Sequence, residues 1–192
     1  MPMIFETLVT TVAADGTVHC APMGAQYDGD EVILMPFRPS ATLDNILASG
    51  CAVLNTATDV RIFAGCVTGR REWPTLPAEQ IAGRRLAAAL AHVELRLLRW
   101  EDDPQRPVLH LGRVVECNHR AFAGFNRAQA AVIEAAVLVS RLHMLAPDKV
   151  DRELAYLQIA IDKTAGPAEL EAWRWIGDAV TAFRAAAGRA AA

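Results

Sequence analysis

Short apolar runs separated by turn residues fill the first part of the chain, which is the pattern of antiparallel β-strands. Asp15-Gly16 and Asp28-Gly29-Asp30 are typical hairpin turns. The apolar runs predict strands at residues 4–12, 18–26, 31–37, 51–55, 92–100 and 108–117, while residues 59–67 fit either a strand or irregular chain. The short connections favour a small antiparallel barrel or curled sheet of about six or seven strands over a parallel sheet.

Apolar residues at helical spacing predict a short helix at residues 41–49 and another at 78–90. After Asn126 the same spacing predicts three further helices, with Gly166-Pro167 between the last two. We therefore expect two domains, which are a barrel over residues 1–120 with a helical insertion at about 77–90, and a helical subdomain over 121–192 that packs on the barrel.

Composition and charge exclude several classes of protein. The chain has 192 residues, 53% of them hydrophobic, and a formal net charge of -3, which excludes a disordered chain. Its 19 basic and 22 acidic residues give no basic surface for nucleic acid. No apolar stretch is long enough to span a membrane, and residues 1–6 lack the features of a secretory signal. The 4 cysteines never form Cys-x-x-Cys, so we predict a cytoplasmic protein with reduced thiols and no metal site.

The segment Pro36–Ile46 leads from a predicted strand into a predicted helix and carries a candidate anion site. Arg38 offers a cationic fork, Ser40 and Thr42 offer hydroxyl groups, and the start of the helix offers free backbone N–H groups. Together these groups suit a phosphate. The alternative is that Ser40 or Thr42 only caps the helix and that Arg38 is solvated.

Two other stretches are candidates for contact with a flat ligand. At Pro22, Met23 and Gly24, small residues and a missing N–H leave one strand accessible, although a bulge packed under a helix explains them as well. Asn55 ends a predicted strand, and its amide can both donate to and accept from the edge of a heterocycle.

Taken in order, these motifs resemble the flavin reductase-like FMN-binding split barrels. Within them the sequence is most similar to a subfamily of methanogenic archaea and methylotrophic bacteria that is catalogued as a domain of unknown function. The similar segments are Thr10-Thr11, Asp15-Gly16, Ala21-Pro22-Met23-Gly24, Pro36-Phe37, Thr42-x-x-Asn45, Asn55-x-x-x-Asp59, Phe125-Asn126-Arg127-Ala128, Glu134-Ala135, Ser140-Arg141-Leu142-His143 and Lys163-Thr164-x-Gly166.

The resemblance implies a fold that is mainly β with α, namely a six-stranded antiparallel split β-barrel followed by a C-terminal helical layer. It also implies a homodimer that holds FMN near the subunit interface. The cofactor contacts that it implies are Pro22, Met23 and Gly24 along the isoalloxazine ring, Asn55 at the polar edge of the ring, and Arg38, Ser40 and Thr42 at the phosphate, with Asn45 close by. Phe37 is a further expected cofactor contact.

The chain departs from the resembling proteins at Ala41, because many of them have a basic residue just before the threonine of the phosphate motif. Neutralisation of the phosphate then depends on Arg38, or on an arginine from elsewhere such as Arg127 or Arg141. Arg127, Glu134 and Arg141 are spaced seven apart and share one helix face. An ion network among these side chains explains their arrangement. The alternative is that the side chains line a site for substrate or phosphate. His143 could extend the line.

The leading functional hypothesis is an FMN-dependent oxidoreductase or flavin reductase-like enzyme with a small-molecule substrate. In such an enzyme the flavin performs the redox chemistry, which fits the lack of an evident acid–base pair or nucleophile in the sequence. The distribution of the resembling subfamily suggests a link to pterin-dependent one-carbon metabolism. The alternatives are a flavin carrier or sensor without catalysis, and a barrel that has lost its cofactor.

Overall fold

The computed structural model describes residues 3–190, so Met1, Pro2, Ala191 and Ala192 lie outside the described part of the chain. The chain forms two compact units. The barrel unit contains the described residues up to Thr58 together with Glu72–Phe122, and the helical unit contains Asp59–Arg71 and the described residues from Ala123 onward. Asp59–Arg71 therefore belongs to the helical unit, whereas the sequence assigned it to the barrel.

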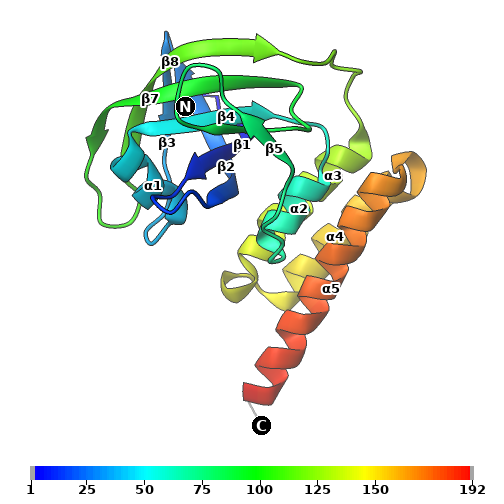
Figure 1. The fold of residues 1–192 in the computed structure, drawn as a ribbon. Helices are drawn as coiled ribbons and strands as arrows, with labels where there is room; N and C mark the ends of the chain where they lie inside the picture. Colours follow the sequence, from blue (N-terminus) through cyan, green and yellow to red (C-terminus); the bar gives the residue numbers. More distant parts are fainter. Residues whose placement is uncertain (1–2, 191–192) are drawn as a thin grey trace. The chain divides into compact units, whose positions relative to one another are not determined.

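Six antiparallel strands of the barrel unit close into a barrel in the order β1-β2-β3-β8-β7-β4 (Figure 1). The strands are β1 (Phe5–Val12), β2 (Val18–Asp28), β3 (Glu31–Leu34), β4 (Cys51–Thr56), β7 (Ala91–Glu101) and β8 (Val108–Asn118). Helices follow the barrel toward the C-terminus, so the predicted fold class is confirmed.

Alternation of side chains along the strands fills the barrel interior with aliphatic residues. Val9, Leu54 and Leu95 are among the buried residues of this core. Helix α1 (Ala41–Ser49) occupies the predicted residues and adds Leu43 and Ile46 to the same core. The N-cap of α1 is Ser40, and Gly50 ends the helix in the left-handed region at a φ of 69°, where glycine avoids the steric cost of a side chain.

Residues 78–90 do not form the predicted helix. The chain makes a hairpin of β5 (Thr75–Pro77) and β6 (Arg84–Leu86), followed by a turn into β7. The pattern of apolar residues was compatible with a helix, but buried polar side chains on the barrel strands bind the backbone of this segment in an extended path. We call residues 75–90 the β5–β6 segment.

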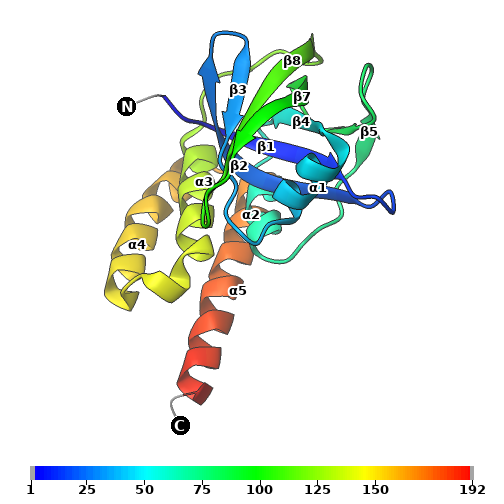
Figure 2. The same ribbon diagram turned by 90° about the vertical axis from the view of Figure 1, so that its left-hand side faces the viewer.

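The helical unit contains α2 (Arg61–Val67), α3 (Arg127–Ser140), the short 3-10 helix η1 (Leu142–Met144), α4 (Pro147–Thr164) and α5 (Pro167–Ala190). Helix α2 replaces the strand or irregular chain expected at residues 59–67. Helix α3 packs against α2, α4 and α5, as Figure 2 shows for α4 and α5. Buried alanines in this contact, among them Ala128, Ala131 and Ala135, let the helix backbones approach closely.

In the described part of the chain, none of the helices has both the length and the apolar character needed to cross a membrane. Residues 3–190 also contain no group of three or more His, Cys, Asp or Glu side chains placed to hold a metal ion.

Candidate functional site

The start of α1 brings Ser40, Thr42 and Asn45 together on one short helix of the barrel unit. The Ser40 hydroxyl accepts a hydrogen bond from the backbone N–H of Leu43 at 3.4 Å, so it caps the helix. The Asn45 amide donates to the Thr11 hydroxyl at 3.0 Å and ties the helix to β1. Thr42 and Asn45 lie three positions apart and therefore share a face of the helix.

The Thr42 side chain is fully buried, and its hydroxyl Oγ1 has no hydrogen-bond partner among residues 3–190. Buried hydroxyl groups nearly always have a partner, because leaving one unpaired costs about 1–3 kcal/mol. A threonine used only for packing at this position gains nothing from its oxygen. Thr42 Oγ1 is therefore an unused hydrogen-bonding group at the start of α1.

Arg38 lies beside this helix start, but its guanidinium already has protein partners. Its Nη2 lies 2.7 Å from the Asp102 carboxylate, and its Nε donates to the backbone oxygen of Asp103 at 3.2 Å. The Arg38 side chain is 36% exposed. Because ion pairs at exposed positions contribute only about 0–1 kcal/mol, an anionic ligand can replace Asp102 at small cost.

The β7–β8 turn adds a second cation that the sequence did not reveal. Arg106 donates from Nε to the backbone oxygen of Met35 at 3.1 Å, and its guanidinium lies 4.9 Å from the centre of the Phe37 ring. The backbone N–H of Arg38 donates to Gln105 at 2.9 Å, which fixes the turn against the segment before α1. Arg106 is distant in sequence from the phosphate motif, so no local pattern pointed to it.

Pro22, Met23 and Gly24 lie on β2 and pair with β1. Since β3 pairs only with residues 25–28 of β2, these three residues have a strand neighbour on one side only within residues 3–190. A Cβ atom added to Gly24 would lie 2.7 Å from Cγ2 of Ile4, so the space above Gly24 holds the Ile4 side chain. The backbone edge at Pro22–Gly24 is therefore the accessible feature of this strand.

Asn55 does not face a ligand site. It is fully buried, and its amide nitrogen donates to the Leu8 carbonyl oxygen and the Thr10 hydroxyl, each at 3.1 Å. Its amide oxygen accepts from the backbone N–H of Leu86 at 2.8 Å. These bonds use both ends of the amide, so Asn55 anchors the β5–β6 segment and cannot serve the polar edge of a flavin as expected.

Glu94, on the neighbouring strand β7, holds the other end of the same segment. The carboxylate is fully buried and accepts the backbone N–H groups of Glu79, Gln80 (2.8 Å) and Ile81 (3.0 Å). Burial raises the pKa of Glu94, but these donors and His92 outweigh it, so the pKa lies below its ordinary value. The alternation of β7 was predicted from the sequence, but the burial of its polar residues was not.

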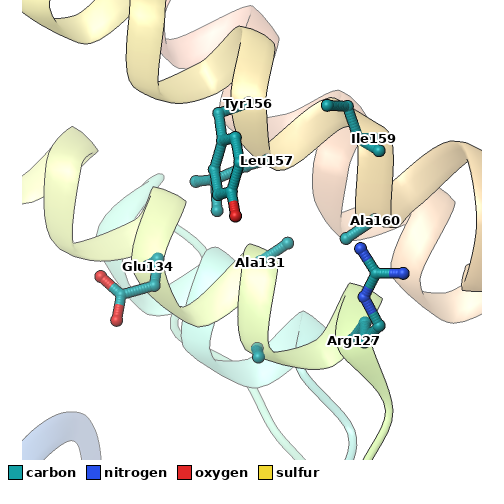
Figure 3. A pocket seen from close by; sticks show the side chains of 8 residues that line it. Arg127, Ala131, Glu134, Tyr156, Leu157, Ile159 and Ala160 are labelled. Atoms are coloured by element: carbon teal, nitrogen blue, oxygen red, sulfur yellow. The ribbon is translucent and has the colours of Figure 1, made fainter.

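In the helical unit, Arg127 and Glu134 on α3 line a pocket of about 230 Å³ between α3 and α4. Figure 3 shows both side chains there, with Tyr156 and Ile159 on α4. Arg141 caps the end of α3 and does not line this pocket, and neither does His143. The predicted line of charges is therefore divided, and within the described residues neither Arg127 nor Glu134 forms an ion pair.

Two family models cover most of the chain. The model described as "Protein of unknown function (DUF447) N-terminal domain" matches residues 5–120, and that described as "Protein of unknown function (DUF447)" matches residues 126–178. The chain belongs to the DUF447 family. The predicted subfamily, a domain of unknown function related to the flavin reductase-like barrels, is thereby confirmed.

Solved structures similar to this DUF447 chain support its fold. The FMN-bound protein MM1853 from Methanosarcina mazei is 22% identical, with a TM-score of 0.79 over 93% of this chain and 96% of that one. The 2-nitrobenzoate 2-nitroreductase NbaA from Pseudomonas fluorescens is 22% identical, with a TM-score of 0.54 over 62% of this chain and 66% of that one. Flavoredoxin from Methanosarcina acetivorans is 13% identical, with a TM-score of 0.52 over 62% of this chain and 71% of that one.

Proposed function

We propose that this DUF447 chain binds FMN on its barrel unit and acts as a flavin-dependent oxidoreductase. The observation that carries the proposal is the buried, unpaired hydroxyl of Thr42 at the start of α1. The likeness to an FMN-bound protein of the same family supports the choice of cofactor. The donor set also fits a phosphate, because free N–H groups at a helix start, a hydroxyl and two arginines lie at this corner of the barrel.

In the proposed site Thr42, Ser40 and the first turn of α1 hold the phosphate. Arg38 and Arg106 neutralise its charge, with Phe37 beside Arg106 and Asn45 securing the helix to β1. Because Thr42 Oγ1 is buried, a change of its rotamer or a small movement of the first turn is needed before a phosphate oxygen can reach it. Asp102 then loses Arg38 as its partner.

The backbone edge of Pro22–Gly24 is the proposed support for the isoalloxazine ring. Pro22 cannot donate a hydrogen bond there, and adjacent residues of an antiparallel strand direct their backbone groups to opposite sides. One of Met23 and Gly24 therefore supplies the backbone groups that orient the ring. Bound FMN supplies the redox chemistry, and the chain contributes binding, orientation and exclusion of water. A homodimer and a link to pterin-dependent one-carbon metabolism remain part of the proposal and rest on the sequence resemblance. A cytoplasmic location also remains part of it and rests on the pattern of cysteines.

Replacement of Thr42 by Val tests the phosphate site with two readouts of opposite sign. The free energy of unfolding without FMN should stay the same or rise by about 1 kcal/mol, because the change removes an unpaired buried hydroxyl. The affinity for FMN, measured by quenching of flavin fluorescence, should fall about tenfold or more through loss of a hydrogen bond to a charged group.

Matched controls are Thr181→Val on α5, where the hydroxyl bonds Gly177 at 2.9 Å, and Arg184→Gln, which breaks a surface pair of 2.7 Å with Asp151. Neither control should change FMN affinity, whereas Arg38→Gln should lower it. Unchanged affinity in both Thr42→Val and Arg38→Gln would remove the proposed site. A parent protein that retains no flavin absorbance after addition of FMN and removal of the unbound flavin would instead support a barrel that has lost its cofactor.

Anaerobic titration of the FMN complex with NADH and with NADPH separates the enzyme from the carrier. Bleaching of the flavin absorbance by either donor supports an oxidoreductase. An FMN complex that stays oxidised with both donors favours the carrier or sensor, which is the second candidate.

A further inference from the structure

The groove between α3 and α4 in the helical unit has walls that are fixed by hydrogen bonds. The Asn126 amide donates to the Thr164 carbonyl oxygen at 3.0 Å, and the backbone N–H of Ala128 donates to the Thr164 hydroxyl at 3.0 Å. These bonds hold the start of α3 against the end of α4, so the two helices run antiparallel. The groove of about 230 Å³ between them is therefore already formed before any partner binds.

The α3 side of this groove is charged at its ends and apolar in its middle. It consists of Arg127, Ala130, Ala131 and Glu134, which lie on one face of the helix. Figure 3 shows Arg127 and Glu134 at opposite ends of the groove, with Ala131 between them. Because the two central residues are alanines, the backbone of another helix can approach closely there.

The α4 side of the groove presents apolar groups to solvent. Tyr156 is 75% exposed and Ile159 is 45% exposed, and both line the groove. Leu157 and Ala160 of the same helix line it as well. Exposed apolar groups that gather beside charged residues are typical of a surface that a partner covers.

The order of residues on the α3 face is self-complementary. Arg127 and Glu134 are seven residues apart, and Ala130 and Ala131 lie midway between them. Suppose that a second α3 lies antiparallel to the first, about a two-fold axis through this midpoint. Arg127 then meets Glu134 of the partner subunit, Glu134 meets Arg127 of the partner subunit, and alanine meets alanine at the axis.

The charges on this face favour that arrangement over the alternatives. Within residues 3–190 neither Arg127 nor Glu134 forms an ion pair, and the two-fold contact gives each of them an opposite charge. A parallel contact between two α3 helices would instead place arginine beside arginine and glutamate beside glutamate, which is unfavourable. The charge pattern therefore specifies both the partner, which is a second copy, and its direction.

We propose that the α3–α4 groove is an interface between two copies of this chain, in which α3 of the partner subunit lies antiparallel in the groove across a two-fold axis. The inference assigns a contact surface to the homodimer of the proposed function and rests on that part of it alone, not on FMN binding.

The test is the self-association of the full chain, measured by analytical ultracentrifugation over a range of concentrations with no flavin added. The parent should associate. Arg127→Glu and Glu134→Arg should each weaken association, because either change places like charges at both symmetric contacts. The expected rise in the dissociation constant is about tenfold for each contact and about a hundredfold in total.

An equal mixture of these two single variants tests the two-fold geometry itself. When one copy of each variant meets the other, the facing positions again carry opposite charges, so the mixture should recover the association of the parent. The double variant Arg127→Glu, Glu134→Arg should recover it too, because the pattern is only reversed. Neither recovery is expected if the two residues serve only their own copy.

Controls on α5 separate this surface from a general effect of charge or of exposed aromatic area. Arg174→Glu and Asp178→Arg make similar changes at exposed positions outside the groove and should leave association unchanged. Tyr156→Ala should weaken association about tenfold or more, as expected for an aromatic residue in an interface. Phe183→Ala, at a position that is 40% exposed, should not weaken it. Circular dichroism checks that each variant is folded.

Three results would overturn the proposal. A parent chain that stays monomeric at every concentration would remove this interface and the homodimer together. Single variants that associate as strongly as the parent would show that the copies meet through another surface, so the homodimer would stand without this interface. Single variants that stay apart after mixing would exclude the antiparallel two-fold contact. FMN binding is measured separately, so its failure is distinguishable from each of these results.

Discussion

Replacement of Glu94 by Gln should loosen the β5–β6 segment. In the parent, Oε1 accepts from Glu79 and His92, and Oε2 accepts from Gln80 and Ile81. A glutamine keeps one acceptor oxygen and turns the other into an NH₂ donor. Depending on the orientation of the amide, the groups that lose their acceptor are either Gln80 and Ile81, or Glu79 together with a His92 that donates from Nε2. At about 1–3 kcal/mol for each unpaired buried donor, the expected loss of unfolding free energy is about 2–4 kcal/mol.

The difference in unfolding free energy between the parent and Glu94→Gln should decrease as the pH falls. The pKa of Glu94 is lowered in the folded protein, so the ionised carboxylate stabilises the fold above the unfolded value of about 4.3. That stabilisation is lost as the pH falls through the lower folded value. The unfolding free energies of the two proteins should therefore show their full difference near pH 7 and converge in acid.

Urea denaturation followed by circular dichroism measures this difference, and hydrogen exchange at Gln80 and Ile81 locates it. The matched control is Glu116→Gln on β8, an exposed carboxylate that pairs with Arg113 at 3.6 Å, which should change stability by less than about 0.5 kcal/mol. If Glu94→Gln is as stable as Glu116→Gln at neutral pH, the β5–β6 segment is not held by this carboxylate.

Three further predictions concern single side chains. Asn55→Ala should lower the unfolding free energy by about 2–3 kcal/mol in denaturation, because it leaves buried backbone groups unpaired; an unchanged value would contradict its anchoring role. Gly50→Ala should destabilise the fold by about 1 kcal/mol, since the φ of Gly50 is 69°. Gly177→Ala inside α5 should stabilise it by about 1 kcal/mol, since nothing lies within 4 Å of the added Cβ; equal effects of the two changes would contradict this reasoning. Asp102→Ala should free Arg38 and raise FMN affinity about two- to fivefold, and lower affinity would show that Asp102 helps binding.

The sequence predicted the barrel because each strand alternates independently of the rest of the fold. Val93 and Leu95 point into the core while Glu94 points out, and this pattern is visible in the letters alone. The start of α1 could also be predicted from the sequence, because capping and anion binding both depend on local residues such as Ser40. Such features need no knowledge of what lies far away in the chain.

The predictions that were wrong or incomplete concern residues whose contacts lie far away in the sequence. Residues 78–90 have helical spacing, but their backbone N–H groups bind Glu94 and Asn55 on two other strands. Arg106 reaches Met35 only because the β7–β8 turn folds back on that segment. Asn55 was interpreted as a ligand residue because its amide can bind a heterocycle, yet the structure uses that same capacity for the backbone of Leu86.

Polar residues on the outward face of a barrel strand usually meet solvent, but Thr10, Asn55, His92 and Glu94 are all buried. The cover over them is largely irregular chain, whose backbone groups lack the regular partners of a helix or sheet. Polar side chains beneath the cover supply those partners, so the segment is held mainly through its backbone. It follows that the exposed side chains of Glu79 and Gln80 can change with little effect on stability. Gly83 is more constrained, because a Cβ there would lie 3.1 Å from Cγ2 of Val53, so that this side chain or the segment would have to shift.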